Sequence, residues 1–178
     1  MQGLTDFAAA INQDNHSDML SKALTTIAPE VLLPLCAALE NEPLPVTLID
    51  CILDKLQAAF VNNNLELQQH LLRSLASSCH HQHVSNFITK LLAQQQLSDD
   101  VLITLAGRCW LLWQQQTLLM SYLEQVVNHG DTPLFNAIFK DLVAIPKIRA
   151  VLFQCMRDPN RSTALAQAIG RLFNPSSH

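Results

Sequence analysis

A cluster of metal-ligating side chains lies near the middle of the chain. Cys79, His80, His81 and His83 follow one another closely, and thiolate and imidazole groups are ligands for zinc and nickel. On a helix, Cys79 and His83 would share one face because they are four residues apart. A structural zinc site needs four ligands, and no second cluster follows at a recognisable spacing. We therefore expect a polar loop between helices whose histidines face water, with no bound metal.

Two carboxylates lie on a predicted helix further upstream. Asp50 and Asp54 are four residues apart, with Lys55 beside them, and paired carboxylates perform acid–base chemistry when burial separates their pKa values. Nothing in the surrounding sequence predicts burial, so we expect a solvated face. The chain has only four glycines, too few for a glycine-rich phosphate loop, and it lacks GxSxG and HExxH motifs. We expect no enzyme activity and no cofactor.

Two tryptophans, Trp110 and Trp113, could stack a base or a small ligand. They lie in a stretch, residues 101–113, whose apolar positions fill about half of a helical wheel, so we expect them to pack in the core. A small-molecule site here would need a closed apolar cavity lined by both tryptophans together with Phe135 and Phe139. In the same stretch, we expect Gly107 to allow a close approach of two helices.

The composition favours helices. Apolar residues make up 49% of the chain and 31 residues are leucine, whereas tyrosine occurs once, which argues against a sheet-rich fold. Charged residues make up 15% and the net charge is −4, so nucleic acid is not the expected partner for the surface as a whole.

No apolar run is long enough to span a membrane. Five cysteines without a CxxC motif or a signal peptide indicate a reducing compartment, and we expect a cytoplasmic protein.

Start and stop signals divide the chain into about ten to eleven helices. Asn64, Ser98 and Asp131 are predicted N-caps, and their spacing of 34 and 33 residues is the period of a two-helix repeat. Helices are expected over residues 4–12, 17–28, 29–40, 45–60, 64–77, 82–94, 98–113 and 115–128. Three more are expected to begin at residues 131, 145 and 160, and the last of these ends before residue 175.

Antiparallel helix pairs, prolines near helix starts and leucine-rich faces resemble HEAT-type α-solenoids over residues 29–173. Segments 35–45, 105–110 and 134–139 also resemble the C-terminal part of an uncharacterised proteobacterial family, which implies no activity. We expect one all-α domain over residues 1–178, as a whole protein or as a fragment of a longer one. The predicted architecture is a short HEAT-like solenoid of stacked helix pairs, and a compact multi-helix bundle is the alternative.

Charge is unevenly distributed along the sequence. Residues 1–66 hold nine acidic and two basic residues, whereas residues 67–178 hold six acidic and nine basic residues. A chain with this asymmetry could bind an acidic partner at its C-terminal end, or a second copy head to tail. The candidate partner-binding residues are Lys147, Arg149, Arg157, Arg161 and Arg171.

These features together predict a non-catalytic scaffold for protein–protein interaction or self-association. Stacked helix pairs build extended surfaces, and a weakly charged exterior leaves apolar area exposed, which commonly marks an interface. Two alternatives stay open. A helical small-molecule-binding domain would need the aromatic cavity described above, and a nucleic-acid-binding HEAT-like domain would need the C-terminal basic residues to converge on one concave face.

Overall fold

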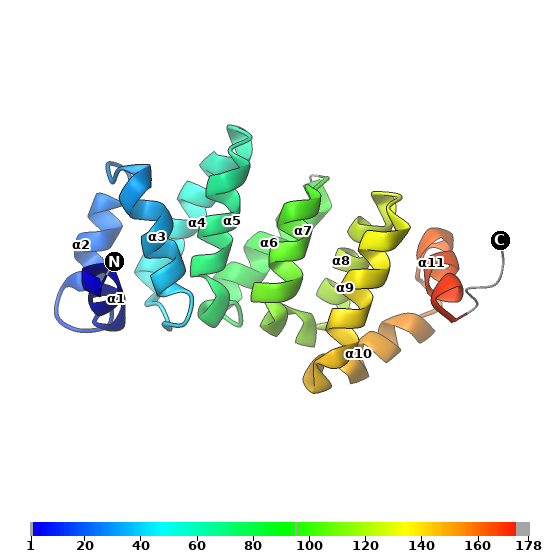
Figure 1. Cartoon of the computed structure of the whole chain (residues 1–178). Coiled ribbons are helices and arrows are strands. Elements are labelled where there is room, and N and C mark those ends of the chain that lie inside the picture. The colour runs from blue at the N-terminus through cyan, green and yellow to red at the C-terminus, as the bar shows by residue number, and fades with distance from the viewer. Residues whose placement is uncertain (1, 95, 174–178) are drawn as a thin grey trace. The chain divides into compact units, whose positions relative to one another are not determined.

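The structure, a computed structural model, describes residues 2–94 and 96–173, and every regular element in those ranges is a helix (Figure 1). Helices account for 78% of these residues, which confirms the predicted all-α class. The elements in order are α1 (Gln2–Ala9), α2 (His16–Ala23), α3 (Pro29–Leu39), α4 (Val46–Val61), α5 (Leu65–Ser74), η1 (Ala76–Ser78), α6 (Gln82–Gln94), α7 (Asp99–Arg108), η2 (Trp110–Gln114), α8 (Gln116–Asn128), α9 (Thr132–Ala144), α10 (Pro146–Arg157) and α11 (Thr163–Phe173).

The predicted N-caps are confirmed. The side chains of Asn64, Ser98 and Asp131 each accept a hydrogen bond from the backbone N–H three residues later, over 3.1, 3.4 and 3.2 Å. Ser162 does the same for α11, where its hydroxyl accepts from the Leu165 N–H at 3.0 Å. Each bond satisfies a backbone donor that the first turn of a helix otherwise leaves unpaired.

Several predicted helices end earlier than expected. The helix expected over residues 98–113 ends at Arg108, Cys109 leaves the helical conformation, and the 3-10 helix η2 follows. Similarly, the helix expected over 64–77 divides into α5 and η1, and that expected over 17–28 ends at Ala23. A 3-10 turn repeats every three residues, so its apolar spacing is hard to distinguish from that of an α-helix.

The chain divides into two compact units, residues 1–87 (unit 1) and residues 88–178 (unit 2). The division falls within α6, and the expectation of a single domain stays a prediction. In unit 1, α1 packs on α3, α3 on α5, α2 on α4, and α4 on α5. The amphipathic helix α4 supplies much of this core, with Leu48, Ile49, Ile52 and Leu56 fully buried.

Unit 2 has an aromatic core. Its helices pack in the pairs α7–α9, α8–α10, α8–α11 and α9–α10. Trp113 is fully buried, which confirms the expected core packing for this tryptophan, whereas Trp110 is only half-buried. Phe135 and Phe139, named above as lining of a possible ligand cavity, are also buried. Trp113 stacks on Tyr122 with ring centroids 4.2 Å apart.

Tyr122 anchors this aromatic pair to α7. Its hydroxyl donates to the Leu102 carbonyl at 2.7 Å, which satisfies a polar group that would be costly to bury unpaired. Burial raises the pKa of Tyr122 well above its usual range, so the hydroxyl stays a donor at neutral pH. The stack is therefore fixed at one end by a hydrogen bond as well as by packing.

Gly107 does not allow a close helix approach, and that expectation is wrong. It is exposed in the last turn of α7, and a Cβ at this position would meet none of the described residues within 4 Å. Gly170, in α11, is equally open. By contrast, Gly130 has a φ of +74°, a left-handed conformation that a Cβ disfavours.

We expect Gly107→Ala and Gly170→Ala each to raise the free energy of unfolding by about 0.5–1 kcal/mol, because alanine restricts the unfolded chain without strain in the helix. Urea denaturation followed by circular dichroism measures the change. Gly130→Ala is the control and should lower stability, since its backbone is left-handed. Equal responses at the three positions would contradict the prediction.

Candidate functional site

The predicted metal candidates are not assembled into a site. Cys79 is buried, and its thiol donates to the Leu75 carbonyl at 3.1 Å. His80 and His83 are exposed, and the rings of His81 and His83 meet edge to face at 4.9 Å. In the part of the chain that the structure describes, no three His, Cys, Asp or Glu side chains are arranged to hold a metal ion.

The structure instead brings one residue of the Cys79–His83 cluster into contact with one of the two predicted carboxylates. His83 Nδ1 lies 2.5 Å from Asp50 Oδ1, and both side chains are about half exposed. No local pattern in the sequence indicates this contact, since the two residues come from α4 and α6. Asp50 and Asp54 are both exposed, as expected. Exposed polar contacts, even between charged groups, contribute little to stability, so this contact marks a polar surface rather than a reactive centre.

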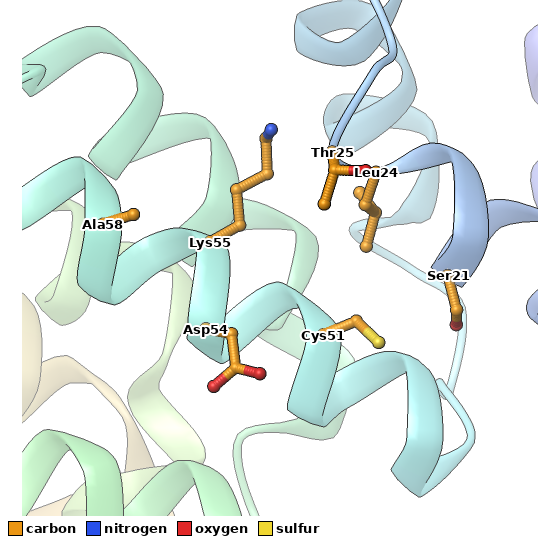
Figure 2. Close-up of a pocket in the computed structure, with 7 residues that line it drawn as sticks. All are labelled: Ser21, Leu24, Thr25, Cys51, Asp54, Lys55 and Ala58. Atoms are coloured by element: carbon orange, nitrogen blue, oxygen red, sulfur yellow. The ribbon is translucent and has the colours of Figure 1, made fainter.

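A pocket of about 350 Å³ opens between α2 and α4, as Figure 2 shows. We call it the α2–α4 pocket; it is lined by Ser21, Leu24, Thr25, Cys51, Asp54, Lys55 and Ala58. Its volume falls within the ~300–1,000 Å³ typical of sites that enclose small groups. Sequence reasoning singled out Asp54 and Lys55 but missed the pocket, because the residues in and just after α2 that complete it lie more than 25 positions upstream of those on α4.

The two charged residues of the α2–α4 pocket do not neutralise each other. Their side chains leave α4 in opposite directions (Figure 2). Neither Asp54 nor Lys55 forms a hydrogen bond or ion pair with a residue in the described ranges. Both charges are therefore free to interact with a group that enters or covers the pocket.

Two of the buried thiols stay protonated at neutral pH. Burial raises the pKa of Cys36 to about 12. Burial also raises the pKa of Cys155, to about 11, and the nearby Asp158 carboxylate adds to the effect. The thiolate is the nucleophilic form of cysteine, so neither thiol is suited to nucleophilic chemistry under these conditions.

The helix α10 presents a basic and aromatic surface, which we call the α10 face: Arg149, Phe153 and Arg157. These residues are four apart and so share one side of the helix, whereas Ile148, Leu152 and Cys155 are buried on the other. Phe153 is 40% exposed, and α10 contains no acidic residue. The α10 face therefore combines positive charge with an exposed aromatic ring.

The arginines of the α10 face differ in how they are held. Arg149 Nε donates to the Val143 carbonyl at 2.9 Å, which ties its side chain to the end of α9. Arg157 is exposed and forms no hydrogen bond or ion pair with any residue that the structure describes. The guanidinium of Arg157 is therefore available to a carboxylate outside the chain.

The five predicted partner-binding residues are only partly brought together. Lys147, Arg149 and Arg157 belong to α10, and Arg171 is exposed on α11. Arg161 is half-buried and donates to the Asp158 carbonyl at 2.7 Å, so it stabilises the turn before α11. Sequence reasoning missed Phe153, although its spacing of four residues from each arginine was visible.

The structure thus defines an all-α protein with an exposed basic and aromatic helix face in one unit and a small pocket in the other. The chain belongs to the family described as Protein of unknown function (DUF3549), which matches residues 1–173. The match identifies no HEAT or other solenoid family. Searches of curated proteins and of solved structures found no match. Within the described ranges, no helix has both the length and the apolar character needed to cross a membrane.

Proposed function

We propose that the protein is a non-catalytic scaffold that binds a protein partner through the α10 face. The observation that carries this proposal is the exposed ring of Phe153 between two arginines on a helix without acidic residues. Aromatic and arginine side chains contribute most to binding at protein interfaces. A partner with carboxylates around an apolar patch would satisfy both features at once.

A protein partner suits this surface better than a nucleic acid. Unit 2 holds eight basic and six acidic residues, so its excess of positive charge is small. Nucleic-acid binding relies on many phosphate contacts by lysine and arginine. An interface in which apolar contact supplies affinity and charge supplies orientation needs only the few cations of α10.

The proposal includes a HEAT-like arrangement of helix pairs. Within unit 1, α1 packs on α3 and α3 on α5, while α2 packs on α4; within unit 2, α7 packs on α9 and α8 on α10. Contact between every second helix is expected where two-helix repeats stack, and stacked repeats present extended binding surfaces. The proposal includes a cytoplasmic location, which is supported by the absence of a disulfide among the five cysteines in the described ranges.

We expect the double reversal Arg157→Glu and Arg171→Glu to slow association with the partner roughly ten-fold at low salt and to weaken its salt dependence. Both side chains are exposed, so stability should change by no more than about 0.5 kcal/mol. The measurement is capture of partners from lysate by the immobilised protein at low and high salt, followed by association kinetics with the captured protein.

The matched control reverses two other exposed basic residues, Lys22 and Lys90, to glutamate, which changes the net charge equally. This control should bind as the wild type does. An equal loss of binding in both variants would show that total charge governs binding, rather than the positions of Arg157 and Arg171. A wild-type protein that stays monomeric and retains no partner would contradict the scaffold function.

A further inference from the structure

We propose that the partner of the α10 face is a second copy of the chain, in which Phe153 of one copy enters the α2–α4 pocket of the next. This inference rests on the proposed function, because it uses the same α10 face. Two kinds of complementarity support it: one between an exposed aromatic ring and an open pocket, and one between unpaired charges of opposite sign.

The apolar complementarity is between Phe153 and the lining of the α2–α4 pocket. Phe153 is 40% exposed, so part of its ring lacks protein contact. The pocket, of about 350 Å³, offers Leu24, Cys51 and Ala58 as apolar contacts. A ring at the centre of an interface, seated in a pocket on the partner, is the usual form of a strong binding contact.

The charge complementarity surrounds the same two features. Arg149 and Arg157 each lie about 6 Å along the helix axis from Phe153, and Asp54 lines the pocket with Asp50 one turn away on α4. Asp54 and Arg157 form no ion pair within the described residues, so a contact between them breaks no existing pair. Guanidinium and carboxylate groups form strong, well-oriented hydrogen bonds.

The overall charge distribution favours the same contact. Unit 1 holds nine acidic and three basic residues, whereas unit 2 holds six acidic and eight basic residues. The repulsion expected from a net charge of −4 is screened beyond about 8 Å at physiological salt. Across a direct contact, the attraction between the acidic surface of one copy and the basic surface of another therefore acts at shorter range, and is screened less, than the repulsion between the whole chains.

Lys55 does not oppose this contact. Its side chain leaves α4 in the direction opposite to that of Asp54 (Figure 2), so it leaves the Asp54 carboxylate open to an arginine. An ammonium group beside an aromatic ring is also attracted to the face of the ring. Lys55 could therefore contact Phe153 once the ring has entered the pocket.

Such a contact joins two different surfaces, so it is heterologous. Each copy carries one α10 face and one α2–α4 pocket, and the contact can repeat from copy to copy. Loss of either surface leaves a chain that can form only one contact. This property allows a direct test with variants that each lack one surface.

Sedimentation of the full chain over about 1–200 µM at low salt is the test. We expect the wild type to form species heavier than one chain. Phe153→Ala removes the ring and Ala58→Trp fills the pocket, so each variant alone should be monomeric. Their equimolar mixture should form a complex of two chains and no larger species, because only one intact contact is present.

A charge exchange tests whether Arg157 and Asp54 meet. Arg157→Asp and Asp54→Lys should each weaken assembly about ten-fold, and the two changes together should restore it. Both side chains are exposed, so the fold is expected to survive. Ile103→Ala is the matched control, since Ile103 is 51% exposed on α7 of the same unit as Phe153 and should leave assembly unchanged.

The outcomes separate this inference from the proposed function. A wild type that is monomeric at every concentration overturns the inference, as do oligomers that Phe153→Ala leaves intact, or a mixture of the two variants that stays monomeric. If the monomeric wild type still captures another protein through the α10 face, the scaffold function stands and its partner is a different protein. If it captures nothing, both proposals fail.

Discussion

Replacement of Trp113 by alanine is expected to lower the free energy of unfolding by about 3–5 kcal/mol, the usual cost of removing a large buried aromatic side chain. Trp113 is completely buried and stacks on Tyr122. Its loss leaves a cavity and removes the stacking contact, so both the transfer and the packing contributions to stability are lost. Urea denaturation followed by circular dichroism provides the measurement.

Trp110→Ala is the matched control, because Trp110 lies three residues earlier in η2 but is only half-buried. Its cost should be clearly smaller. Trp113→Phe should also cost less than Trp113→Ala, because phenylalanine keeps most of the aromatic packing. Trp113 Nε1 is buried without a hydrogen-bond partner among the described residues, so its removal breaks no hydrogen bond. Equal costs at Trp110 and Trp113 would contradict the assigned core of unit 2.

Removal of the Arg73 guanidinium is expected to cost about 2–3 kcal/mol, the second largest effect. Arg73 on α5 donates to the carboxylate of Glu40 at the end of α3, and Glu40 is only 8% exposed. Arg73→Ala takes this cation away from a largely buried carboxylate. Arg73 is itself 38% exposed at its side chain, so we expect less than the ~3–5 kcal/mol of a fully buried pair.

The double variant Arg73→Ala with Glu40→Gln tests the cause of this loss. It should be less destabilised than Arg73→Ala alone, because a neutral amide is less costly to bury than a charge. Lys22→Ala, at an exposed lysine, should change stability by no more than about 0.5 kcal/mol. A loss at Arg73 no larger than at Lys22 would show that water screens the pair. Urea denaturation measures all three variants.

The starts of three helices were predictable because the interaction that defines them is local. Asn64, Ser98 and Asp131 each bond to a backbone N–H three residues away, and that relationship is visible in the sequence. The end of α7 was not predictable in the same way. The change from α-helix to the 3-10 helix η2 accompanies the burial of Trp113 against Tyr122, which depends on a helix further along the chain.

The residues of the candidate site also divide into those that the local sequence predicts and those that only the packing of helices brings together. The basic residues of α10 could be predicted from composition, and the spacing of Phe153 could have been used as well. The α2–α4 pocket and the contact between Asp50 and His83 join separate helices. A single sequence contains no local signal for such contacts, because they depend on how amphipathic helices pack on one another.

The uneven burial of the cysteines gives the folded chain a distinctive chemical reactivity. Cys36, Cys79, Cys109 and Cys155 are buried, and Cys51 alone is half-exposed. A thiol-alkylating reagent therefore has one accessible target in the native protein and five in the unfolded chain. Because Cys51 lines the α2–α4 pocket, its rate of alkylation reports directly on whether that pocket is open or filled.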